Sequence, residues 1–167
     1  LLLLLQCSVI VMNKHLYQGF SLIHLMAAIA ILGILSAIVY PGYQSYVRDA
    51  RIRQAQSKLL DNARALEQFY IRNHSFRQNS TTWAALPITA TEHFCIRFQG
   101  NPRAVRPADA EKFTLKAVAF DADKEPRVIR INESHTLSIC ETSRSRCTDN
   151  AAFFSGASGT DKNCRVV

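Results

Sequence analysis

Residues 19–43 read GFSLIHLMAAIAILGILSAIVYPGY, and this stretch decides the fold. From residue 20 to residue 40 it is apolar apart from two serines and His24, and no side chain in it carries a fixed charge. At about 1.5 Å per residue, a helix of this length spans roughly the 30 Å hydrocarbon core of a bilayer. The stretch therefore predicts a membrane-spanning helix over residues 20–45, followed by a polar, basic body over residues 46–167.

The short polar stretch before the apolar run predicts how the helix is oriented. It reads MNKHLYQG (12–19), and its cation, Lys14, favours a cytoplasmic N-terminus with the body on the other side of the membrane. We expect residues 1–19 to form a leader, of which LLLLLQCSVIV (1–11) fits no part of the scheme and is expected to be spurious upstream sequence. Pro41 removes one helix hydrogen bond, so a kink is expected there.

Cysteine usage and charge describe the compartment and the partners of the body. Its four cysteines predict two disulfides in an oxidising compartment. Zinc is the competing interpretation, but the spacings contain no C-x2-C pair and no histidine lies beside a cysteine. Three connectivities are open, and we expect Cys95–Cys140, joining the first strand to the last, and Cys147–Cys164, closing a C-terminal loop. The net charge of +7 favours anionic partners such as nucleic acid, anionic lipid or polysaccharide.

The body begins with an amphipathic helix and continues with strands. From Tyr46 to about Arg72, apolar residues recur at steps of three and four, and most cations lie elsewhere on the helix. Four runs of strand-like character follow, HFCIRF, KFTLKAVAF, RVIRI and HTLSIC, with turn signals between them. The order predicts an α+β fold in which one long helix packs on a four-stranded antiparallel sheet. Residues 141–167 are rich in small polar residues and predict a loop that needs disulfides to hold it.

The sequence contains no recognisable catalytic constellation. GASGT (156–160) lacks the lysine and the spacing of a phosphate-binding loop, there is no H-E-x-x-H, and the histidines are scattered. We therefore expect no enzymatic activity, no cofactor and no metal. A membrane-anchored enzyme stays as an alternative of another class.

Alternation along three of the strands places one cation of each strand on the same face. In FCIRF, FTLKAVAF and VIRI the apolar side chains share one face, which leaves Arg97, Lys116 and Arg130 on the other. Two interpretations stay open. Exposed sheet faces attract Lys and Arg in general, or these three cations form a basic stripe that binds an anionic partner.

The N-terminal third resembles a type IV prepilin. GFSLIHL is similar to the site of prepilin peptidase, which implies cleavage between Gly19 and Phe20 and methylation of the new Phe20 amine. YPGYQSYVRDARIRQA resembles the segment that follows in pilins. His24 departs from the family, which has a glutamate there. Drift in a subunit of low abundance and placement at a filament tip or only sparsely along the filament both remain as explanations. The resemblance implies a type IV pilin roll, other pilins as partners, and an inner-membrane prepilin that later enters the extracellular pilus.

The body resembles the ComP-type minor pilins, the DNA-uptake receptors of Neisseria and its relatives. The matching segments are LLDNARALEQFYIRNHSF, TWAALPI, FCIRF, FTLKAVAFDADKEP and the late cysteine-bounded loop. This resemblance implies binding of double-stranded DNA during natural transformation. It implies that the stripe contacts DNA and that cations of the C-terminal loop contribute, a set comprising Arg97, Lys116, Arg130, Arg144, Arg146 and Lys162. A structural or adhesive minor pilin, or a pseudopilin, whose basic face is incidental is the alternative.

Overall fold

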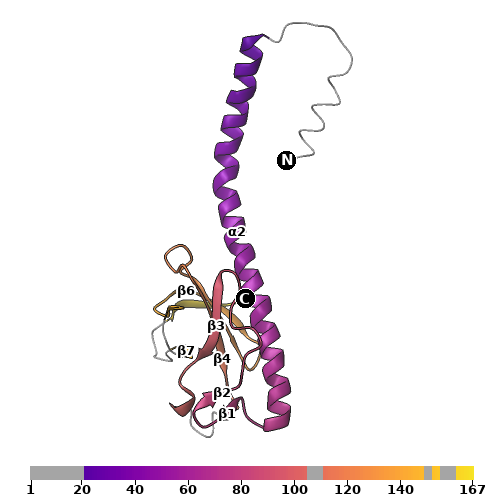
Figure 1. The fold of residues 1–167 in the computed structure, drawn as a ribbon. Coiled ribbons are helices and arrows are strands. Elements are labelled where there is room, and N and C mark those ends of the chain that lie inside the picture. Colours follow the sequence, from indigo (N-terminus) through magenta and orange to yellow (C-terminus); the bar gives the residue numbers. More distant parts are fainter. Residues whose placement is uncertain (1–20, 105–110, 149–151, 155–160) are drawn as a thin grey trace. The chain divides into compact units, whose positions relative to one another are not determined.

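The structure is a computed structural model that describes residues 21–104, 111–148, 152–154 and 161–167 (Figure 1). Its contacts divide the chain into two compact units, Leu1–Gln44 and Ser45–Val167. One helix, α2 (Leu22–Asn73), contributes residues to both units and stays helical through position 41. The predicted kink at Pro41 remains a prediction.

The first unit presents an apolar helix surface. Over the described residues, α2 is long and apolar enough to cross a membrane, and the large apolar side chains of its first turns, such as Leu22 and Ile38, are exposed. The helix ends in the second unit, where His74 takes a left-handed φ of 51° and its N–H donates to the Tyr70 carbonyl at 2.7 Å. A left-handed residue directly after the last turn is a common way for a helix to stop.

The second unit is built on a six-stranded sheet. The strand order is β7-β3-β4-β5-β6-β8, and a separate pair, β1 (Arg77–Asn79) and β2 (Thr82–Trp83), lies outside it. The four predicted strands form its antiparallel centre, with bounds β3 (Phe94–Gln99), β4 (Thr114–Ala119), β5 (Val128–Asn132) and β6 (Leu137–Ser143). The predicted α+β pilin roll is confirmed in this arrangement of helix and sheet.

Two edge strands extend the sheet beyond the prediction. β7 (Phe153–Phe154) pairs parallel with β3, and β8 (Asp161–Val166) pairs antiparallel with β6. Both lie in the stretch that the sequence predicted to be a loop. The composition of β8, DKNCRV, is poor in the residues that favour strands, so its pairing depends on the β6 edge and on a disulfide.

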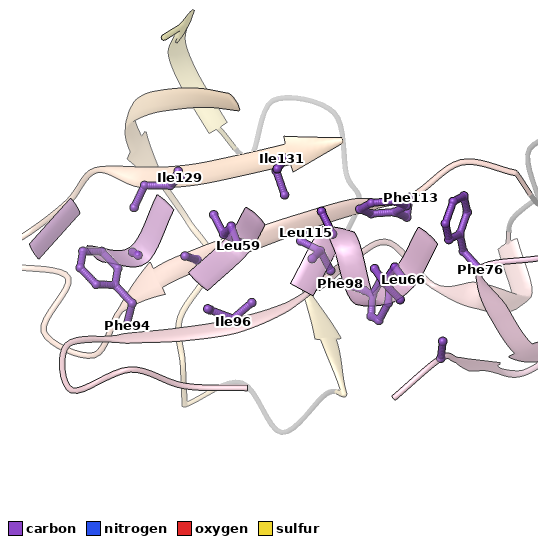
Figure 2. Close-up of a cluster of buried hydrophobic side chains, with 14 of the residues drawn as sticks. Leu59, Leu66, Phe76, Phe94, Ile96, Phe98, Phe113, Leu115, Ile129 and Ile131 are labelled. Atoms are coloured by element: carbon purple, nitrogen blue, oxygen red, sulfur yellow. The ribbon is translucent and has the colours of Figure 1, made fainter. Parts of the chain in front are cut away.

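The helix-facing side of the sheet holds the main core (Figure 2). Leu59 and Leu66 of α2 contact the sheet, and both are buried. The strand residues predicted to point inward are buried in the same cluster, namely Phe94, Ile96, Phe98, Phe113, Leu115, Ala117, Ile129 and Ile131. The period-two alternation of the strands therefore placed this face correctly.

The other face of the sheet is also buried, which the sequence analysis did not anticipate. Cys95, Val118, Val128 and Cys140 form a second cluster there with Phe154. The cover comes from the described residues between β6 and β8, 144–148 and 152–154, here named the covering segment. The sequence of β4 could have indicated this second buried face. Its residues 115–119, LKAVA, contain only one residue that is not apolar, and all five are buried.

The disulfide connectivity differs from the prediction. The bonds join Cys95 to Cys147 and Cys140 to Cys164. The predicted Cys95–Cys140 bond is wrong because β3 and β6 are separated by two strands, roughly 14 Å at the usual strand spacing, and a disulfide needs Cα atoms within about 7 Å. The predicted Cys147–Cys164 bond is wrong as well, because Cys164 on β8 lies directly opposite Cys140 and bonds to it. Cys147 of the covering segment bonds to Cys95 instead.

Tryptic mapping without reduction tests this connectivity, because trypsin cuts between all four cysteines of the body. We expect peptide 78–97 to be joined to 147–162, and peptide 131–144 to 163–165, as masses that disappear on reduction. A mass joining 78–97 to 131–144 would contradict the structure and restore the pairing expected from the sequence.

A matched pair of phenylalanine substitutions tests whether the outer face is covered. Phe154→Ala should lower the free energy of unfolding by about 3–5 kcal/mol, because this side chain is fully buried. Phe120→Ala removes a ring that is 55% exposed and should cost well under half as much. Urea unfolding of both variants gives the comparison, and equal losses would mean that the covering segment does not pack on the sheet.

Candidate functional site

The three predicted stripe cations lie in one row across neighbouring strands. Arg97 of β3 is directly opposite Lys116 of β4, and Lys116 is directly opposite Arg130 of β5. The row continues to Ser138 on β6. All three cations are on the face away from α2, because their strand neighbours fill the helix-facing core. The predicted alignment is therefore correct.

The predicted exposure of this row is wrong. The Lys116 side chain is 0% exposed, Arg130 retains 32% exposure, and Arg97 is half-buried. Alternation along a strand reports which face a residue occupies, but it cannot report that a later segment returns to cover that face. Lys116 consequently cannot reach a DNA phosphate in this structure.

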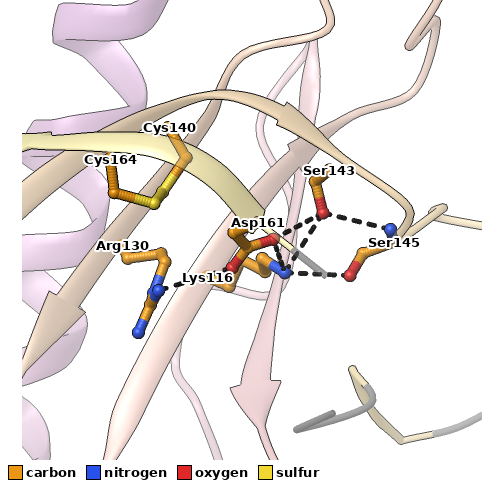
Figure 3. Close-up of polar contacts among 7 residues, drawn as sticks. All are labelled: Lys116, Arg130, Cys140, Ser143, Ser145, Asp161 and Cys164. Carbon is orange, nitrogen blue, oxygen red and sulfur yellow. Dashed lines mark hydrogen bonds and ion pairs between the residues drawn. A yellow bond between two sulfur atoms is a disulfide. The ribbon is translucent and has the colours of Figure 1, made fainter. Parts of the chain in front are cut away.

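Lys116 lies at the centre of a buried polar network (Figure 3). Its Nζ forms an ion pair of 2.6 Å with Asp161 Oδ1, and the Asp161 side chain is only 3% exposed. The same Nζ donates to Ser145 Oγ at 2.9 Å and to Ser143 Oγ at 3.3 Å. Ser143 Oγ in turn donates to Asp161 Oδ1 at 2.6 Å and accepts the Ser145 N–H at 3.1 Å. Each of the three ammonium hydrogens thus has an acceptor.

The two arginines of the row also contact the residues that cover it. Arg130 Nη1 lies 3.5 Å from Asp161 Oδ2, as an ion pair without hydrogen-bond geometry (Figure 3). Arg97 Nη2 donates to the Cys147 carbonyl at 2.7 Å. The Phe154 ring contacts two cations of the row. Its centroid lies 5.4 Å from Arg97 Cζ and 5.7 Å from Lys116 Nζ. Such cation–ring contacts gain strength where water is excluded.

The protonation of Lys116 reflects opposing effects. Burial disfavours the charged ammonium and lowers the pKa of Lys116, and the nearby Arg130 charge acts in the same direction. The hydrogen bond and the negative charge of Asp161 raise the pKa and offset part of the effect. The Asp161 carboxylate is thus the group that favours the charged form of Lys116 against the effect of burial.

The predicted loop cations are at the surface. Arg144 and Arg146 follow β6, Lys162 follows the first residue of β8, and all three are exposed. Lys162 pairs with Thr142, two residues before Arg144, so Arg144 and Lys162 belong to the same end of the β6–β8 pair. Arg146 borders a depression that is also lined by Asp121 and Asp123.

One exposed cation of β8 was not among the site residues predicted from the sequence. Arg165 lies on β8 opposite Ile139 and is exposed. Recognising NCRVV as part of an edge strand would have identified it. Among the described residues no group of three His, Cys, Asp or Glu side chains could hold a metal ion. Gly19 and Phe20, the predicted cleavage and methylation positions, lie outside the described residues.

Comparison with known proteins gives the family. A family model described as "Type IV minor pilin ComP, DNA uptake sequence receptor" matches residues 41–143, which include α2 of the second unit and strands β3 to β6. The prokaryotic N-terminal methylation motif matches residues 14–40. The two matches meet at Pro41 and together cover most of the chain.

Solved structures and curated relatives agree with this match. The solution NMR structure of the minor DNA-uptake pilin ComP from Neisseria subflava is 41% identical, covers 70% of this chain and 95% of that chain, and has a TM-score of 0.56. The type IV major pilin protein PilE1 of Neisseria gonorrhoeae is 36% identical over 67 residues, 40% of this chain and 41% of that protein. The fimbrial protein EcpC of Eikenella corrodens is 41% identical over 59 residues, 35% of this chain and 39% of that protein.

The match to the curated relatives spans about two fifths of their length, whereas the family model and the NMR structure match the body as well. The helix, the antiparallel sheet and the two disulfides of the second unit accordingly occur in a chain whose N-terminal stretch is that of a pilin. The chain belongs to the family of the type IV minor pilin ComP, the DNA uptake sequence receptor.

Proposed function

We propose that this chain binds double-stranded DNA outside the cell, as the receptor of DNA uptake in natural transformation. The observation that carries the proposal is the family match over residues 41–143, which contains the whole row of aligned cations. The net charge of +7 agrees with a polyanionic partner. The family is one of pilins, and we propose that the chain performs no chemistry of its own.

The proposed contact surface is the outer side of the sheet with its covering segment and β8. Its exposed cations, Arg144 and Lys162 first and Arg146 beside them, are the ones that phosphates can reach. Arg97 and Arg130 contribute through the parts of their side chains that remain exposed. Lys116 is withdrawn from the contact set because its side chain is buried and paired.

The exposed Lys and Arg side chains of this surface predict DNA binding that weakens as salt rises. They do not by themselves predict a preference for particular base sequences. Lys and Arg contacts to phosphates release counterions, so affinity falls as salt rises, whatever the sequence. Preference for particular bases requires groove contacts or DNA shape. Among the described residues α2 is the sole α-helix, and its body half packs on the sheet, so side chains of loops and edges are the available readers.

Assembly and location follow from the N-terminal stretch. We propose that prepilin peptidase cleaves between Gly19 and Phe20, that the new Phe20 amine is methylated, and that residues 20–45 anchor the subunit in the inner membrane before it joins other pilins. The methylation motif over residues 14–40 and the apolar surface of α2 support this course.

A structural or adhesive minor pilin that binds no DNA is the second candidate. The observation that favours it is the neutralisation of Lys116 by Asp161, which removes one of three aligned charges from the surface. Binding of duplex DNA by the isolated body separates the two candidates.

A gel shift with residues 45–167, which form a compact unit, tests the proposal. The body should retard a short labelled duplex at 50 mM salt and release it as salt rises. Arg144→Ala with Lys162→Ala should weaken binding and reduce the slope of log affinity against log salt by about 2, because each lost phosphate contact contributes about 0.9.

The control removes two charges from the other side of the sheet. Arg51 and Arg64 are exposed on α2, so Arg51→Ala with Arg64→Ala lowers the net charge equally while the proposed surface stays intact. This variant should keep most of the slope. No retardation by the unmodified body at low salt, or equal loss in both double variants, would support the structural pilin instead.

A further inference from the structure

We propose that Lys116 is a positioning residue, which holds the end of β6, the start of β8 and the covering segment in place, and that it makes no contact with DNA. Its effect on binding rests on the function proposed above. The hold on the chain itself is independent of that function.

The first argument is that Lys116 has no capacity left for a phosphate. The side chain is completely buried, and its three donors are directed to Asp161, Ser145 and Ser143. An ammonium carries three hydrogens, so a phosphate contact would require one of these bonds to break and the cover to open. A cation that acts on DNA directly would be expected at the surface, as Arg144 and Lys162 are.

The second argument comes from which residues the ammonium holds. Ser143, Ser145 and Asp161 meet at Lys116 (Figure 3). The residues beside them in the sequence, Arg144, Arg146 and Lys162, are exposed cations. Lys116 thus fixes the backbone on both sides of Arg144 and directly before Lys162. Arg144 and Lys162 therefore stay exposed while their neighbours in the chain are held at Lys116.

The third argument is that the rest of the row acts on the same stretch of chain. Arg130 pairs with Asp161, and Arg97 holds the Cys147 carbonyl and lies over the Phe154 ring. The disulfides attach the same stretch at Cys147 and Cys164. The three aligned cations therefore bind the covering segment and β8 to the sheet. The buried charge of Lys116 is tolerated there only because its partners are present.

Variants that remove Lys116 alone, and then Lys116 together with Asp161, distinguish a positioning role of Lys116 from a direct contact with DNA. Lys116→Met keeps the length of the side chain but leaves Asp161 buried beside Arg130 alone, so the amides of 143–145 and 161–166 should exchange hydrogen faster. Lys116→Met with Asp161→Asn removes both charges and keeps an acceptor for Ser143, so exchange should return close to that of the unmodified protein.

Duplex binding by the same variants gives the second readout. Lys116→Met should weaken binding severalfold with the salt slope unchanged, and the double variant should recover most of the affinity although it lacks the lysine. Lys162→Met is the matched control, since it removes an exposed lysine and should lower the slope by about 0.9 with hydrogen exchange unaltered.

Two results would overturn the inference. One is a salt slope that falls by about 0.9 in the double variant, which would make Lys116 a phosphate contact. The other is hydrogen exchange of 143–145 and 161–166 that Lys116→Met leaves unchanged. If the unmodified body binds no duplex, the proposed function fails while the exchange measurements still decide the role of Lys116. If Lys116→Met alone does not fold, the slope of the double variant decides between contact and positioning.

Discussion

The ion pair between Lys116 and Asp161 is the interaction on which the outer side of the sheet depends. Placing a lysine in the middle of a buried sheet face is costly, and a carboxylate from another strand with two serine hydroxyls offsets that cost. The partner comes from β8, which has little tendency of its own to form a strand. The polar pair therefore specifies where an otherwise weakly determined part of the chain lies.

The two faces of the sheet are stabilised in different ways. The helix-facing side is an ordinary apolar core, in which residues such as Leu59 and Ile129 lose water-exposed surface. The outer side combines a small apolar cluster around Phe154 with two disulfides and a buried polar network. Directional bonds tolerate little displacement, so the outer side fixes the path of a polar segment that apolar packing alone would leave poorly defined.

This arrangement changes how an electropositive stripe is understood in this protein. Alignment of Arg97, Lys116 and Arg130 across three strands is real, but the row mainly faces the chain's own C-terminal residues. The charges that a polyanion can meet are exposed at the surface, on Arg144 of the covering segment and on Lys162 of the edge strand β8. In the proposed function, the residues that contact DNA and the residues that support them are of the same types, the first exposed and the second buried, and sequence composition cannot separate the two groups.

The local pattern of side chains was sufficient for the helix, the four central strands and the side on which each cation lies, because period and alternation are properties of neighbouring residues. The number of disulfides could also be predicted from the sequence, since the count of cysteines and the expected oxidising compartment do not depend on the three-dimensional structure. The partners of Cys95 and Cys140, the edge strand β8 and the burial of Lys116 were decided by the tertiary structure. Each of these depends on where a polar segment far along the chain returns to the sheet, and no local periodicity records that path.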